Sequence, residues 1–326
     1  MIVGGDWIYL SILFFLLQLL IYLNFIFYTH LFDPFFPKVE GTNVIGTIEP
    51  SGSATRQVLV VGHHDSTYVI TFRSHFQKLF VFRVMGVFLF WLVGFCTSLL
   101  LSFYRLVYQT EPAYSGVLLI VLLAGLLFVV PFFFYFSRRG SPGAGDNLAA
   151  CAMGIKIAEL LGGQQAPRPL QQTRVVVLST DGEEPGMLGA EAFARVHQEE
   201  LKDLKTYVLN FDTIYKAADL TLVTKDRNAT IRLSGTMVAD CRRIAADLGY
   251  PIKAGPIPTG GGATDAARFA EIGVEAVSIL PMSMALIQED TWFHTPNDTV
   301  EHIEPAAVEA CLSIAYRYIL EKDRAG

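Results

Sequence analysis

The sequence has few cysteines, and they show neither a C-x-x-C pair nor a disulfide pattern. Only four, Cys96, Cys151, Cys241 and Cys311, are spread over 326 residues, and Cys96 lies within a long apolar run. This distribution fits a reducing compartment. It excludes a fold that depends on a disulfide framework.

The sequence also lacks an excess of basic residues, internal repeats and low-complexity linkers. Its 25 lysines and arginines are outnumbered by 31 aspartates and glutamates, which gives a net charge of −6. Nucleic-acid binding requires a basic surface, so this charge balance argues against a nucleic-acid partner. The length suits one sizeable α/β domain with additional segments.

Long apolar runs, in contrast, are abundant, and 52% of the residues are hydrophobic. Residues 7–28, 85–103 and 114–136 contain no charged side chain, and each run approaches the roughly 20 residues with which a helix crosses a bilayer. A buried core helix is seldom apolar on all sides, so we predict three transmembrane helices. The first run lacks a basic start and a following cleavage site, which favours a retained anchor over a signal peptide.

Basic residues lie mainly on one side of these runs. They are Lys38, Arg73, Lys78, Arg83, Arg138 and Arg139. The loop 104–113 on the other side contains only one basic residue, Arg105. By the positive-inside rule, we expect an integral membrane protein whose catalytic domain faces the cytoplasm and whose amino terminus lies outside.

The apolar runs divide the chain into three predicted parts. An N-terminal transmembrane anchor spans 1–37, and a discontinuous globular domain comprises 38–72 and 138–326. An inserted transmembrane hairpin, 73–137, separates the two pieces of that domain. The two ends of the hairpin are therefore expected to emerge from the globular domain.

The globular part alternates apolar strands with amphipathic helices. Strands are predicted over 43–48, 57–62, 174–179, 206–211, 220–224 and 275–280, and helices over 146–161, 188–197, 233–248, 266–271 and 305–321. This alternation predicts an α/β fold, a three-layer α/β/α sandwich with a mostly parallel mixed sheet. In such sheets, ligands bind at the carboxyl ends of strands.

The stretch VLVVGHHDS (58–66) is an apolar strand that ends in possible metal ligands. If the strand persists through Asp65, alternation places His63 and Asp65 on one face, with His64 pointing away. A carboxylate next to a metal-bound histidine fixes its tautomer. Taken alone, however, such a pair is more typical of an ordinary strand end.

Further acidic residues and a histidine are similarly placed. Asp146 follows a Gly-rich turn, Glu183 and Glu184 follow a buried strand, Asp212 ends another strand, and His294 lies in a late loop. Taken singly, each has an ordinary explanation: Asp146 would be a helix cap, and the two glutamates would belong to an acidic loop. Asp212 would end its strand, and His294 would lie on the surface. Together, their carboxylates would repel one another at one sheet edge unless cations bind there. Mixed imidazole and carboxylate ligands suit zinc.

The motifs together resemble those of the co-catalytic di-zinc aminopeptidases, whose relatives include glutamate carboxypeptidases and glutaminyl cyclases. In chain order they are HHD (63–65), GDN (145–147), EEPGMLGA (183–190), NFD (210–212), TDAARFAEIG (264–273) and HTPNDT (294–299). The resemblance covers about residues 40–70 and 140–322, most of the globular part.

The resemblance implies two Zn²⁺ ions with five ligands, His63, Asp146, Glu184, Asp212 and His294. His63 and Asp212 would hold one ion, Glu184 and His294 the other, and Asp146 would bridge them. The two ions would polarise the scissile carbonyl and lower the pKa of a shared water.

The resemblance also implies two catalytic residues besides the ligands. Glu183 would be the general base that transfers a proton from water to the leaving amine, and Asp65 would orient His63. The chain departs from the family pattern at Gly145, where Asn is common, and at Thr264-Asp265-Ala266, where Ser-Asp-His is frequent. The role of Asp265 stays open.

The sequence therefore predicts a membrane-anchored metallo-aminopeptidase that contacts the lipid bilayer and acts on peptides or amides. If the hairpin gates access, Phe72, Phe76 and Phe80 would line the approach for membrane-associated substrates; a hairpin that only tethers the domain is the alternative. The alternative functions are an amidohydrolase or glutaminyl-cyclase-like enzyme for acylated or lipid-like amides, and a non-catalytic receptor or scaffold. Phe293 occupies a position where cyclases favour Trp, which weakens the cyclase alternative. The sequence gives no indication of oligomeric state.

Overall fold

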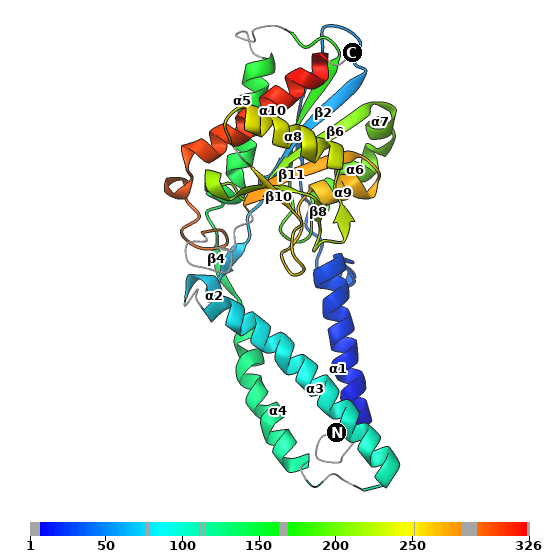
Figure 1. Cartoon of the computed structure of the whole chain (residues 1–326). Coiled ribbons are helices and arrows are strands. Elements are labelled where there is room, and N and C mark those ends of the chain that lie inside the picture. Colours follow the sequence, from blue (N-terminus) through cyan, green and yellow to red (C-terminus); the bar gives the residue numbers. More distant parts are fainter. Residues whose placement is uncertain are drawn as a thin grey trace.

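The computed structural model describes residues 7–75, 79–110, 113, 115–162, 169–250, 252–281 and 292–324. A globular domain carries the carboxyl terminus at its far end, and three helices extend from the opposite end (Figure 1). These helices are α1 (Trp7–Ile21), α3 (Phe80–Tyr108) and α4 (Ser115–Val129).

A seven-stranded mixed sheet forms the centre of the globular domain. Its order is β1 (Val44–Ile48), β5 (Thr173–Thr180), β2 (Arg56–His63), β6 (Lys205–Phe211), β11 (Glu275–Pro281), β7 (Leu220–Val223) and β10 (Lys253–Gly255). The four central strands β5, β2, β6 and β11 run parallel, whereas β1 and β7 pair antiparallel with β5 and β11. The prediction of a mostly parallel sheet is confirmed. The short strand β10 was not predicted.

Helices cover both faces of this sheet. One face is packed by α5 (Ala149–Gly162), α8 (Gly235–Asp247) and α10 (Pro305–Arg324), and the other by α6 (Leu188–Val196), α7 (Gln198–Asp203) and α9 (Ala266–Glu271). Side chains alternate along β2, so Val58 and Val60 join the first core cluster while Leu59 and Val61 join the second. The continuous apolar run is thus buried on both sides, and His63 is its last residue.

Among the described residues, two helices are long and apolar enough to cross a membrane, Trp7–Ile26 and Phe82–Tyr108. The third predicted span is a shorter apolar helix, Leu119–Phe134. Its last turn is a 3-10 helix, Val130–Phe134, that contains Pro131, which has no N–H to continue the α-helical hydrogen bonds. Of the three predicted spans, the first two are therefore long enough to cross a membrane, and the third is shorter.

The inserted segment returns to the globular domain through a two-stranded sheet that was not predicted. Strand β3 (Tyr68–Ile70) pairs antiparallel with β4 (Phe136–Gly140), and the short helix α2 (Thr71–Ser74) follows β3. These two strands join the base of the helical hairpin directly to the end of the globular domain (Figure 1).

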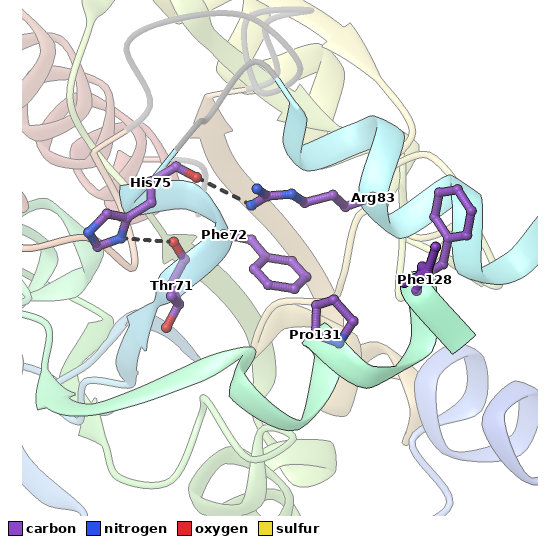
Figure 2. A pocket seen from close by; sticks show the side chains of 7 residues that line it. Thr71, Phe72, His75, Arg83, Phe128 and Pro131 are labelled. Atoms are coloured by element: carbon purple, nitrogen blue, oxygen red, sulfur yellow. Dashed lines mark hydrogen bonds between the residues drawn. The ribbon is translucent and has the colours of Figure 1, made fainter. Parts of the chain in front are cut away.

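A cavity of about 630 Å³ opens at this base, between α2, the start of α3 and the end of α4 (Figure 2). It is lined by Thr71, Phe72, His75, Arg83, Leu127, Phe128 and Pro131. The guanidinium of Arg83 lies 4.9 Å from the ring centroid of Phe72, and Arg83 Nη1 donates to the carbonyl oxygen of His75 at 3.4 Å. Of the phenylalanines expected to shape access, Phe72 lines this cavity and Phe76 lies outside the described residues.

The segment that follows α1 docks onto the globular domain. Asn228, between strands β8 (Lys225–Asp226) and β9 (Ile231–Arg232), donates from Nδ2 to the carbonyl oxygens of Phe25 and Ile26 at 2.9 and 3.3 Å. Nη2 of Arg268 lies 3.0 Å from Nε2 of His30. The end of the first apolar helix is therefore bonded to the globular domain through its own main chain.

Candidate metal centre

Five loops and strand ends bring the candidate ligands together at one edge of the sheet. His63 is the last residue of β2, Asp212 follows β6, and Glu184 follows β5. Asp146 lies in the turn Ala144–Leu148 before α5, and His294 precedes α10. The helix predicted from residue 146 begins later, at Ala149, because Asp146 has non-helical backbone angles (φ −124°, ψ 80°).

The ligand atoms form two groups that share Asp146. His63, Asp146 and Asp212 each place one such atom within 4.8 Å of the others, and so do Asp146, Glu184 and His294. Nε2 of His63 lies 3.3 Å from Asp146 Oδ1, whereas Nε2 of His294 lies 3.0 Å from Asp146 Oδ2. The two oxygens of Asp146 therefore face different groups, as a bridging carboxylate requires.

The backbone around Asp146 is fixed on both sides. The N–H of Gly145 donates to Asp298 Oδ1 at 2.7 Å, and Asn147 Nδ2 donates to the carbonyl oxygen of Phe211 at 2.8 Å. A Cβ atom at Gly145 would lie 2.1 Å from Cε1 of Tyr215, so only glycine fits there without a shift. At this position, where the resemblance predicted Asn to be common, the ring of Tyr215 thus occupies the space that a side chain would need.

Asp65 holds the loop that carries both glutamates. Its Oδ1 and Oδ2 accept hydrogen bonds from the backbone N–H groups of Glu183 and Glu184, at 3.0 and 3.1 Å. Its Oδ1 also lies 3.4 Å from Nδ1 of His63. Sequence reasoning expected the contact with His63 and missed the backbone bonds, which link residues 118 and 119 positions apart.

Unsatisfied buried atoms in both groups fit a bound cation. Nε2 of His63 and Oε1 of Glu184 are buried and, within the described residues, make no hydrogen bond. Such atoms are costly to bury unless a ligand completes them. Two imidazoles and three carboxylates are a donor set that suits zinc. The residues present therefore fit the metal that the family resemblance implies.

The electrostatics of the cluster favour bound cations as well. Burial raises the pKa of Asp212 to about 7, with the charge of His63 opposing this shift and that of Asp146 adding to it. Burial alone would lower the pKa of His294, but its hydrogen bonds to Asp146 and Glu184 raise it to about 9. The carboxylates thus attract compensating positive charge, which divalent cations would supply.

Glu183 lies beside the two groups and belongs to neither. Its Oε2 is 3.9 Å from Nε2 of His63. Burial raises the pKa of Glu183 well above its usual range, and although the charge of His63 opposes this, those of Asp212 and Asp265 raise it further. A carboxylate with this environment is suited to accept a proton.

The neighbouring polar residues make other bonds. Nδ1 of His64 lies 2.8 Å from Ser179 Oγ, so His64 faces β5 and away from the ligand groups. Asp265 is buried and its Oδ2 accepts a hydrogen bond from Thr180 Oγ1 at 2.5 Å. Tyr28, which follows the first apolar helix, was missed by sequence reasoning: a Cβ atom at Gly186 would lie 3.3 Å from its Cδ1, so its ring packs beside the loop that carries both glutamates.

Comparisons with known proteins identify the family of this chain. The model of peptidase family M28 matches residues 130–319, more than half of the chain. Aminopeptidase YwaD of Bacillus subtilis (strain 168) is 26% identical over 175 residues, which cover 52% of this chain and 35% of that protein. The chain thus spans about a third of the length of this relative.

Two solved structures share the fold. BSAP, a zinc aminopeptidase from Bacillus subtilis, has a TM-score of 0.53 at 18% identity, covering 86% of this chain and 49% of that one. A glutaminyl cyclase of Bacteroides thetaiotaomicron, solved with N-acetylhistamine, also gives 0.53 at 13% identity, covering 86% and 77%. Because the family model covers most of the sheet and all but one of the candidate ligands, this chain belongs to peptidase family M28.

Proposed function

We propose that this protein is a membrane-anchored, zinc-dependent aminopeptidase that hydrolyses amino-terminal peptide or amide bonds. The observation that carries the proposal is the carboxylate of Asp146, whose two oxygens face two separate groups of ligand atoms while Glu183 lies beside both. Within the family, such a pair of sites next to a buried glutamate is suited to hydrolysis of an amide.

Five residues would hold the two cations. His63 and Asp212 would hold one, Glu184 and His294 the other, and Asp146 would bridge them. Bound zinc would supply a Lewis acid for the scissile carbonyl and would lower the pKa of the attacking water.

The remaining steps depend on the protein's own residues. Glu183 Oε2 would take the proton of the attacking water and deliver it to the leaving amine, because Glu183 lies beside both groups of ligand atoms and its Oε2 is 3.9 Å from Nε2 of His63. Asp65 acts as a positioning residue, because its carboxylate fixes the backbone N–H groups of both Glu183 and Glu184. The position of the proposed general base would thus be set by a residue in the loop that follows β2.

An assay tests this function directly. Detergent-purified protein should contain two zinc ions per chain and release aniline from aminoacyl anilides, and a chelator should abolish that release. Cyclisation of an amino-terminal glutamine, or cleavage of acyl amides alone, would replace the proposal with the cyclase-like or amidohydrolase alternative. Protein that binds no zinc would favour a receptor or scaffold.

The membrane arrangement is part of the same proposal. The first apolar helix would be a retained anchor (1–37), and the helices of 73–137 would form a hairpin inserted into a discontinuous domain (38–72 and 138–326). Retention is supported by the hydrogen bonds from Asn228 to Phe25 and Ile26, which a cleaved signal peptide would not need. The basic residues near the base of the hairpin support a cytoplasmic catalytic domain.

Protease protection tests this orientation. In spheroplasts or sealed right-side-out vesicles, an epitope at the carboxyl terminus should resist added protease until the membrane is permeabilised. An epitope inserted in the loop 104–113 should be cleaved in intact vesicles. The opposite pattern of protection would reverse the proposed orientation.

A further inference from the structure

Arg73, in the short helix α2 at the start of the inserted segment, has a guanidinium group with unused hydrogen-bond donors. Its Nε and Nη1 atoms are buried, and neither has a hydrogen-bond partner within the described residues. Burial lowers the pKa of Arg73 to about 10, so the group keeps its charge at neutral pH. A buried cation that has lost water without gaining an acceptor is unfavourable by itself, which suggests that an acceptor arrives with a ligand.

Two aromatic rings hold this guanidinium next to the candidate metal centre. Its Cζ lies 3.8 Å from the ring centroid of Phe293 and 4.8 Å from that of Phe80. The rings of Phe293 and His294 are in turn 4.9 Å apart. Stacking of this kind fixes the plane of a guanidinium and leaves its N–H edge free for an anion.

The carboxylates of the centre do not neutralise Arg73. The charges of Asp146 and Glu184 both act on it, but their oxygens face His63 and His294. Two divalent cations, if bound, would compensate the charges of the three carboxylate ligands at the centre. The side of the centre next to Arg73 is then suited to an anionic group.

We propose that Arg73 binds a carboxylate of the substrate, so that the enzyme prefers short peptides with a free carboxylate close to the scissile bond. This inference rests on the proposed aminopeptidase function. The carboxylate could come from the carboxyl terminus of a dipeptide or from an acidic first side chain, and a guanidinium recognises both with the same charge-assisted hydrogen bonds.

Two substrate pairs separate these sources. Ala-Ala is compared with Ala-Ala amide, and glutamyl anilide with glutaminyl anilide. In the wild-type protein, kcat/KM should favour the charged member of at least one pair by roughly 10–100-fold, mainly through KM, as expected for one hydrogen bond to a charged group. In Arg73→Met, which keeps an unbranched side chain between the two rings, this ratio should fall towards one.

Arg83→Met is the matched control, because Arg83 also stacks on an aromatic ring but lines the cavity at the hairpin base. It should keep the wild-type ratio. An active wild-type protein without a preference, or a preference that survives in Arg73→Met, overturns the role of Arg73 alone. A wild-type protein that cleaves none of the four substrates overturns the proposed function together with it. If Arg73→Met does not fold, Arg73→Lys decides: a weakened ratio supports the role of the planar guanidinium, and an unchanged ratio overturns it.

Discussion

Replacement of Glu183 by glutamine should lower kcat for aminoacyl anilide hydrolysis by roughly 10²–10⁴-fold, the usual contribution of a general base. Glutamine has the same shape, but its amide cannot accept a proton from water as the carboxylate of Glu183 can. Glu183 lies outside both ligand groups, so zinc content should stay at the wild-type value. The measurements are kcat, KM and zinc content of the purified variant.

A surface glutamate provides the control for this substitution. Glu199→Gln on α7 changes the same charge at an exposed position and should leave kcat unaltered. If Glu183→Gln keeps wild-type kcat, Glu183 is not the general base. If it loses zinc together with activity, its role is structural or ligating instead.

Removal of the metal should cost both activity and thermal stability. Each ion present at about 1,000 times its Kd stabilises the folded state by roughly 4 kcal/mol, and about 1 kcal/mol corresponds to roughly 2–4 °C in Tm for a domain of this class. A fall in Tm on the order of 10 °C or more is therefore expected after chelation, and added zinc should reverse it. The repulsion among Asp146, Glu184 and Asp212 is the physical cause.

Single ligand variants divide this effect between the two sites. Asp146→Asn should lose both ions because its carboxylate is shared, whereas Asp212→Asn should lose only one. Zinc content by elemental analysis and Tm by calorimetry are read on the same samples. Two retained ions in Asp146→Asn would show that Asp146 does not bridge the sites, and an unchanged Tm after complete chelation would contradict the electrostatic argument.

The sheet could be predicted from the sequence because its strands are buried on both faces. Runs such as the one that ends at His63 are continuously apolar, which in a chain with alternating helices is typical of parallel strands. The polar residues at their carboxyl ends could be placed at one edge by this topology alone. Those residues do meet there: His63, Asp146 and Asp212 form one group, and Glu184 and His294 share Asp146 in the other.

Contacts between distant segments could not be predicted from the sequence in the same way. The bonds from Glu183 and Glu184 to Asp65, the fit of Gly145 against Tyr215, and the position of Arg73 depend on packing in three dimensions. None of them leaves a periodic pattern in the chain. The strands β3 and β4 were missed for a related reason, because each is short and adjoins an apolar helix that dominates the local pattern.

The docked end of the first apolar helix has a kinetic consequence. If the first apolar helix is a membrane anchor, the bonds from Asn228 to the carbonyl oxygens of Phe25 and Ile26 would leave little slack between bilayer and domain. A domain held in this way would reach only a thin layer of water along the lipid. Its turnover would then follow the number of substrate molecules per unit of membrane area, and dilution of the surrounding solution would change it little as long as that surface density stayed constant.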